Sequence, residues 1–272
     1  MSELMKAFEK YGVGVAKPKT NSAVLFIGTL PSKDNKSLIK EICDNSPKII
    51  YFSPMEDLLL HAKADKYVKY EIGSETGALA LLAKFLLKDK KLDESAANYI
   101  DELDEGYLSA ESNIGEEEIE KSAEIFYEND LTLLLGDDLH NHPNADTIGG
   151  LIALINRFVS LHVSVLNGSE LISKNSAILP PRIEEISSFD GMAVYFCPQK
   201  NESEKLLASS QFAMAAKIKD EDEIIISTKK GEYKKTFEIS DKLKGMIAIL
   251  GIKEQKGYRY EVAKVIKRAM NG

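Results

Sequence analysis

The sequence predicts an α/β protein with Rossmann-like parallel sheet units and helical crossovers, followed by a small C-terminal β-barrel-like module. Short, largely apolar runs that stop at glycine or proline are typical of strands buried on both faces, and residues 23–28 (AVLFIG) and 48–53 (KIIYFS) are the first two. Helical segments alternate with such runs, which is the order of a parallel sheet with helical crossovers. Beyond residue 208, short strand patterns follow one another with turn residues between them, which indicates an antiparallel, barrel-like module.

The first part of the α/β region has the layout of a βαβ unit. Helices are expected at residues 37–43 and 55–64, one after each of the two buried strands, and a short strand is expected at 67–70. A helix at residues 75–87 has apolar residues on every side, so it should be buried. A short helix at residues 1–10 precedes the first strand.

A second unit of similar layout follows. Asn113 stands three residues before Glu116, which resembles a capping box, and the helix that begins there should run to about Asn129. The remaining elements expected in this unit are strands at residues 131–136 and 162–166, with a helix that begins near Pro143 between them. An irregular stretch, residues 167–190, then leads to a strand at residues 192–197.

The C-terminal module should consist mostly of strands. They are expected at residues 223–228, 233–239, 246–250 and 258–262, and a helix at residues 263–270 should close the chain. These patterns predict two domains, an α/β region over residues 1–200 and the small module over residues 201–272.

Charge is unevenly distributed along the chain. Residues 88–112 form an acidic insertion, and residues 93–128 contain 13 acidic residues and one basic residue, Lys121, in a chain whose net charge is −8. Such a stretch is either a solvated face or a surface for a basic partner. No dense stripe of lysine and arginine is present, so nucleic acid is not an expected partner.

The sequence lacks the motifs of several common functional classes. The pair Gly12 and Gly14 has no third glycine and follows no strand, so the dinucleotide fingerprint fails, and neither a P-loop nor a GxSxG elbow is present. No apolar run reaches the roughly 18 residues of a membrane span, and the N-terminus lacks a secretory apolar region. The two cysteines, Cys43 and Cys197, cannot ligate an iron–sulfur cluster, and a reduced cytoplasmic location is expected.

Two local clusters could carry chemistry. Gly73, Ser74 and Glu75 form a glycine turn before a helix, where free backbone N–H groups suit a phosphate, although Ser74 as an ordinary helix cap is the simpler interpretation.

The second cluster follows the strand at residues 131–136. Asp137, His140 and His142 lie where open α/β sheets place their sites, and histidines with carboxylates can ligate a divalent metal. A turn that caps the next helix explains the same residues without a metal.

Taken in order, these segments resemble one family. In the molybdopterin oxidoreductase superfamily, the first Rossmann-like half has a strand that ends near an Asp-Pro pair, then an Ala-Asp pair, then a Pro-Gly-Thr-Asp helix start. The corresponding residues here are Ser53-Pro54, Ala64-Asp65 and Gly73-Ser74-Glu75, which lead to Ala78-Leu79. Residues 111–155 are similar to the large G subunit of respiratory complex I (NADH-quinone oxidoreductase), and residues 211–252 resemble the superfamily's C-terminal barrel.

The expected function follows from the positions at which this sequence differs from the family's pattern. This chain has no cysteine cluster, Ile72 replaces the proline and Glu75 the aspartate of the family's helix start. The resemblance therefore implies a degenerate part of the G subunit that lacks iron–sulfur and molybdenum ligands, has no cofactor and has no activity of its own. It implies a structural subunit or domain in the respiratory chain. The chain would bind other subunits of a complex-I-like assembly in the cytoplasm, peripheral to the inner membrane through those partners.

Two alternatives remain open. In the first, the chain keeps the superfamily's nucleotide pocket, with Gly73, Ser74 and Glu75 facing a guanine or pterin nucleotide and Gly136 and Asp137 opposite. In the second, Asp137, His140 and His142 hold the metal of a hydrolase.

Overall fold

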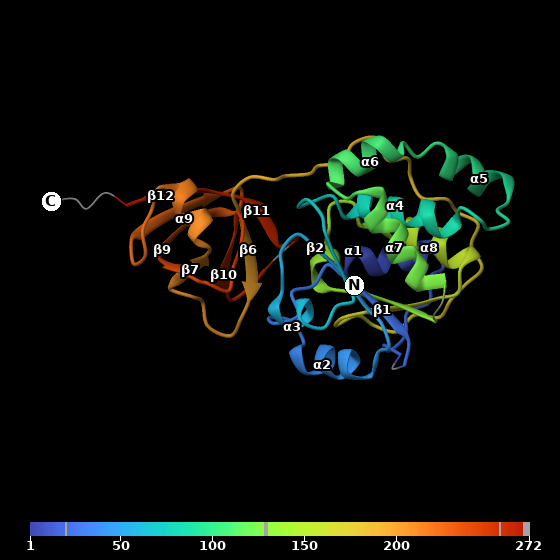
Figure 1. Cartoon of the computed structure of the whole chain (residues 1–272), viewed down its shortest axis with the longest axis horizontal. Helices are drawn as coiled ribbons and strands as arrows, with labels where there is room; N and C mark the ends of the chain where they lie inside the picture. Colours follow the sequence, from blue (N-terminus) through green and yellow to red (C-terminus); the bar gives the residue numbers. More distant parts are fainter. Residues whose placement is uncertain (20, 128–129, 256, 269–272) are drawn as a thin grey trace. The chain divides into compact units, whose positions relative to one another are not determined.

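The computed structural model describes residues 1–19, 21–127, 130–255 and 257–268 (Figure 1). The chain divides into two compact units, Met1–Ser188 and Phe189–Gly272, and each is described by itself. Among the described helices, none combines the length and the apolar character that crossing a membrane requires.

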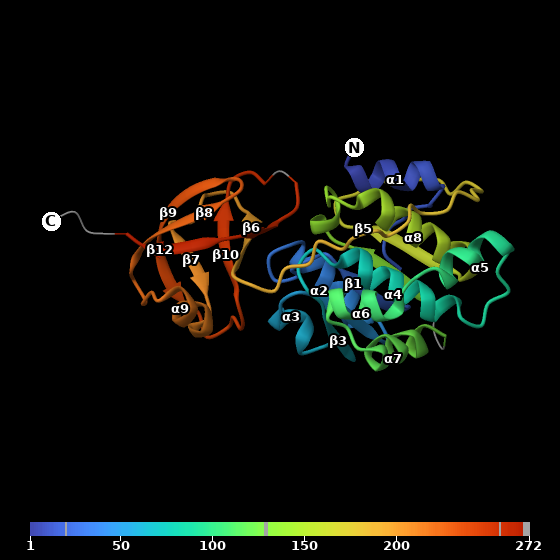
Figure 2. The same cartoon turned by 90° about the horizontal axis from the view of Figure 1, so that it is seen from above.

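The first unit is built on a five-stranded parallel sheet, which confirms the predicted Rossmann-like architecture. The strands lie in the order β3-β2-β1-β4-β5, and every neighbouring pair is parallel. Figure 2 shows β1 between β3 and β5. Their bounds are β1 Ala23–Ile27, β2 Ile49–Ser53, β3 Lys66–Lys69, β4 Leu131–Leu135 and β5 Leu161–Val165. In the centre, Ile27 is in register with Phe52 on one side and Leu135 on the other.

Helices cover both faces of this sheet, as Figure 1 shows. Leu25 and Ile27 of β1 join the core formed with α1 (Glu3–Tyr11), α4 (Glu75–Leu87) and α8 (Ala145–Phe158). Val24 and Phe26 point to the opposite face and pack with α2 (Lys36–Asn45) and α3 (Leu58–His61). Alternate side chains of β1 therefore fill two separate cores, which is why the run is apolar throughout.

The acidic insertion, whose polar sequence is also compatible with a single helix, forms two helices. They are α5 (Glu94–Asp101) and α6 (Glu105–Ser112), and each begins after an aspartate whose side chain accepts a hydrogen bond from a backbone N–H in the first turn. The next helix, α7, spans Glu116–Tyr127, and the predicted end at Asn129 lies outside the described residues.

A segment without helix or extended strand, residues 171–188, runs back across the first unit, and we call it the strap. Near its start, the Leu171 N–H donates to the carbonyl of Val15, and Val15 N–H donates to the Leu171 carbonyl, both at 2.9 Å. Farther along, Tyr99 Oη donates to the carbonyl of Pro181, and Ile186 N–H donates to Tyr107 Oη. These bonds attach the strap to α5 and α6.

The second unit is a seven-stranded, barrel-like mixed sheet in the order β11-β6-β10-β7-β9-β8-β12. The bounds are β6 Ala193–Pro198, β7 Lys205–Ala208, β8 Glu223–Thr228, β9 Gly231–Ile239, β10 Ile247–Ile252, β11 Tyr260–Val262 and β12 Lys264–Lys267. Its core is one cluster of buried apolar residues that includes Phe196, Phe212 and Phe237. The module is not purely antiparallel, because β6 pairs with β10, and β7 with β9, in parallel.

Two details of the second unit differ from the sequence-based expectations. The unit begins at Phe189, before β6, whereas the predicted boundary after residue 200 placed this strand in the α/β region. The reason is that β6 pairs with β10 and β11 of the barrel-like sheet.

The predicted closing helix is also wrong within the described residues. Residues 264–267 form β12, which pairs antiparallel with β8, so that Val265 lies opposite Ile226 and is buried. The sequence did not predict α9 (Ser210–Ala216) or β7 either.

Candidate functional site

The carboxyl ends of β1 and β4 form the position where an open parallel sheet normally binds its ligand. The chain leaves β1 toward α2 on one face and leaves β4 toward α8 on the other, so the two connections diverge here. Such a topological switch point opens a crevice at the ends of the strands. The residues that follow these two strands include Gly28, Gly136 and Asp137.

In this chain, its own residues fill the switch point. Gly136 N–H donates to the carbonyl of Ile27 at 2.9 Å, and Asp138 N–H donates to the carbonyl of Gly28 at 3.0 Å. Leu139 is fully buried, and a Cβ atom added to Gly28 would lie 2.4 Å from Leu139 Cγ. Gly136 is equally confined, because a Cβ there would lie 2.1 Å from the Gly28 carbonyl oxygen. The two loops are therefore in direct contact.

Asp137 lies beside this contact. It is half-buried, and its two carboxylate oxygens accept hydrogen bonds from Asn167 Nδ2 at 3.1 and 2.9 Å. The side chain of Asn167, which follows β5, thus holds Asp137 in place.

The glycine turn before α4 is also occupied by the chain itself. Gly73 has a φ of +86°, and a Cβ there would lie 2.2 Å from the carbonyl oxygen of Ser187 in the strap. Ser74 is buried, and its hydroxyl donates to the Glu71 carbonyl at 2.7 Å instead of capping α4. The strap carbonyl therefore packs against Gly73.

The structure brings Glu75 and His142 together, although the sequence assigned them to different clusters. His142 Nε2 lies 3.0 Å from Glu75 Oε2, and both side chains are almost completely buried. Asn144 N–H donates a hydrogen bond to His142 Nδ1 at 3.0 Å, so the ring proton is on Nε2. The Nε2–H group therefore donates a hydrogen bond to the Glu75 carboxylate. Tyr70 Oη donates to Glu75 Oε1 at 3.4 Å. This bonded pair links the start of α4 to the loop before α8.

The two histidines of the candidate metal cluster do not converge. His142 Nε2 is bonded to Glu75 and its Nδ1 to the Asn144 N–H, while His140 Nε2 lies 3.7 Å from Asp137 Oδ1. Within the described parts of the chain, no group of three or more His, Cys, Asp or Glu residues is arranged to hold a metal ion. The side chains of His140 and His142 therefore do not share a ligand position in the described part of the chain.

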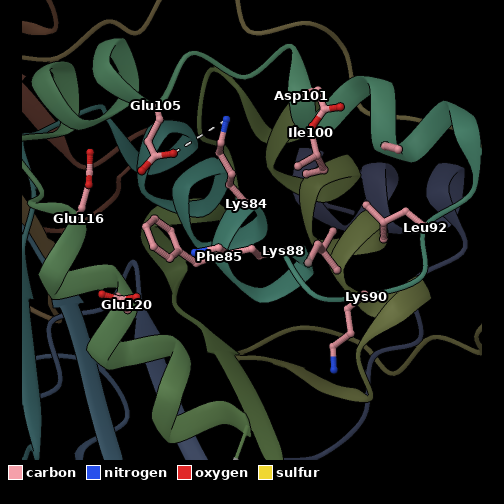
Figure 3. A pocket seen from close by; sticks show the side chains of 12 residues that line it. Lys84, Phe85, Lys88, Lys90, Leu92, Ile100, Asp101, Glu105, Glu116 and Glu120 are labelled. Carbon is pink, nitrogen blue, oxygen red and sulfur yellow. Dashed lines mark ion pairs between the residues drawn. The ribbon is translucent and has the colours of Figure 1, made fainter.

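A groove between α4, α5, α6 and α7 is the site that the sequence did not predict in detail. It has a volume of about 510 Å³, within the roughly 300–1,000 Å³ of ligand-binding clefts. Figure 3 shows the side chains that line it. Half-buried Phe85 and Leu92 and buried Ile100 supply apolar surface. The sequence signal that could have located the groove was the acidic insertion itself.

Charged side chains surround this apolar surface. Lys84 Nζ donates to the Leu103 carbonyl at 2.7 Å and lies 4.0 Å from Glu105 Oε2 (Figure 3). Glu116 and Glu120 stand on successive turns of α7, and both are exposed. The groove thus combines an apolar floor with walls of both charges.

Comparisons with known proteins give little further information. No protein-family model and no curated protein matches the chain. Among solved structures, the chain is similar to acetylene hydratase from Pelobacter acetylenicus, with a TM-score of 0.46 and 16% sequence identity. The match covers 63% of this chain and 25% of that chain, so this chain spans about a quarter of the length of the protein it resembles. A similarity at this level identifies neither an activity nor a cofactor.

Proposed function

We propose that this chain is a non-catalytic structural subunit, or domain, of an NADH-quinone-oxidoreductase-like complex. It would act in the cytoplasmic peripheral arm, where it binds other subunits and is peripheral to the inner membrane through them. The observation that carries the non-catalytic part is the filled switch point, where Leu139 packs against Gly28. The ligand position of an open α/β sheet is used here for internal packing.

The placement of the other candidate residues supports the same interpretation. A nucleotide or pterin pocket would need Gly73 and Ser74 open to a ligand, whereas the strap carbonyl and a hydroxyl–carbonyl bond occupy this turn. A metal-dependent hydrolase would need His140 and His142 to converge, whereas His142 is bonded to Glu75.

Membership of the complex rests on the family resemblance of the sequence and needs a direct test. We would purify the complex through a tag on this chain and identify the co-purifying subunits, using an equally expressed untagged strain as the control. The proposal expects redox subunits of the complex in constant ratio to this chain. Recovery of the chain alone, under conditions in which the complex stays intact, would overturn it.

The non-catalytic role needs a second experiment in cells from which the chain has been deleted. We expect the deletion to lower quinone reduction by the assembled complex. Complementation with a chain carrying Asp137→Asn and His140→Asn should restore it to within about twofold of wild type, because neither residue takes part in the reaction. A loss of activity in this variant with normal assembly would show that the chain is catalytic.

A further inference from the structure

The groove between α4 and α5–α7 has apolar surface that the fold leaves accessible. Phe85 on α4, Leu92 before α5 and Ala97 on α5 are only half-buried, and all three line the groove. An apolar side chain from a partner would cover them, and burial of apolar surface is the main favourable contribution to such an association.

The charge available in the groove is mainly negative. Asp101, Glu116 and Glu120 line it and are exposed, and none of them has a lysine or arginine within ion-pair distance in the described part of the chain. Of the three lysines that line the groove, Lys84 donates to the Leu103 carbonyl and Lys90 Nζ lies 5.2 Å from the Tyr127 ring centroid, while Lys88 is exposed.

The spacing of these acidic residues favours a helix as the occupant. Glu116 and Glu120 are four residues apart on α7, so they stand on the same side of it, about 6 Å apart. Two basic residues with the same spacing on a partner helix would meet them. Lys88 is exposed at the end of α4, where its positive charge interacts favourably with the negative, C-terminal end of α4 itself.

We propose that this groove binds an amphipathic helix of a partner subunit, with an apolar residue against Phe85 and Leu92 and lysine or arginine side chains on Glu116 and Glu120. The inference rests on the proposed function, since it requires a partner subunit, and it adds where and how that partner binds. The recognition follows the helix-in-groove mode, in which residues at positions i, i+3 and i+4 anchor the helix.

The first test reverses the charge of two α7 residues that line the groove and, separately, of two α7 residues that do not. Glu116→Lys with Glu120→Lys reverses the charges that line the groove. The matched control, Glu117→Lys with Glu124→Lys, makes the same change in net charge on the same helix at exposed residues that do not line it. All four residues are on the surface, so both variants should fold, which circular dichroism would check.

Each outcome separates the two proposals. We expect the fraction of chain recovered with the complex to fall about tenfold or more in the groove variant, since each lost pair is replaced by a repulsion, and to stay within about twofold in the control. Retention of both variants would overturn the groove while leaving complex membership intact. Equal loss of both variants would also overturn it, in favour of a diffuse acidic surface. Failure of the wild-type chain to co-purify would instead overturn the proposed function.

The second test identifies the bound segment. A photo-crosslinking residue at position 97, inside the groove, should attach to one subunit of the complex, and mass spectrometry would sequence the attached peptide. The proposal expects a helical segment with an apolar residue at the crosslink and at least two lysines or arginines within one turn of it. An acidic peptide, a segment of this chain itself, or no crosslink in the assembled complex would overturn it.

Discussion

The contact between Gly28 and Leu139 makes a quantitative prediction about the filled switch point. Leu139 is fully buried, so Leu139→Ala should lower the free energy of unfolding of the first unit by about 2–5 kcal/mol. Gly28 has a φ of +70°, so Gly28→Ala should cost about 1–2 kcal/mol for the backbone alone. The clash with Leu139 should add about 1–3 kcal/mol.

The double variant distinguishes these contributions. The three atoms nearest to a Cβ at position 28 are Cγ, Cδ1 and Cδ2 of Leu139, at 2.4, 3.0 and 3.1 Å, and Leu139→Ala removes all three. In that background, Gly28→Ala should therefore cost only the backbone contribution. The combined loss should be smaller than the sum of the two single losses by about 1–3 kcal/mol.

Gly245 provides the matched control. Its φ is +74°, and no heavy atom lies within 4 Å of a Cβ added there, so Gly245→Ala measures the backbone contribution without a clash. We would measure hydrogen exchange of β1 and β4 for the Gly28 variants and of β10 for Gly245→Ala, because a chain with two units need not unfold in one transition. Additive losses at Gly28 and Leu139 would refute the direct contact. Failure of Gly28→Ala to fold, with folding of the double variant, would satisfy the prediction.

Three further predictions concern buried and paired groups. Glu75→Ala should destabilise the first unit by about 2–3 kcal/mol, because His142 loses its hydrogen-bond acceptor. Glu75→Gln keeps an acceptor and should cost less, so equal denaturation midpoints for the two variants would contradict the prediction. Burial raises the pKa of Asp65, but hydrogen bonds from Lys48 and the Ile49 N–H outweigh it and hold the pKa below its usual value. The stability advantage over Asp65→Asn should therefore be full at neutral pH and disappear as the pH falls below about 4, as acid titration would show. Burial raises the pKa of the Cys43 thiol to about 11, so alkylation at pH 8 should be more than about a hundredfold slower in the native chain than in urea, with peptide mapping as the readout.

The sequence was sufficient for the frame of the first unit. The runs that became β1, β2 and β4 are buried at every position, and a strand with two covered faces has to be apolar on both. The burial of α4 followed from its apolar residues in the same way. These properties are local, so they can be read from consecutive residues.

Properties that depend on distant partners could not be predicted in this way. β12 is a strand because β8 pairs with it, and the residues KVIK alone also fit one turn of helix. The bond between Glu75 and His142 joins residues 67 positions apart, and each was taken for part of a different candidate site. Nothing in either local motif indicates the other.

A glycine after a buried strand has two explanations, and this chain shows how they differ in consequence. The missing side chain can make room for a ligand, or it can make room for another part of the same chain. At Gly28 and Gly136 the space is taken by the neighbouring loop, and at Gly73 it is taken by the strap. Substitutions at these three glycines should therefore lower the free energy of unfolding and leave binding to the partner subunit intact.

The exposed carboxylates of α7 should respond in the opposite way. Glu116 and Glu120 are exposed and have no ion-pair partner in the part of the chain that the structure describes, and Glu116 stands in the first turn of α7, where its charge interacts favourably with the helix dipole. Their substitution should weaken binding to the partner strongly and lower stability by only about 1 kcal/mol. If stability and binding can be altered separately at these two sets of residues, the α/β frame serves to present the acidic helices. If every substitution that weakens the frame also weakens binding in proportion, the frame itself is the binding surface and the groove is not.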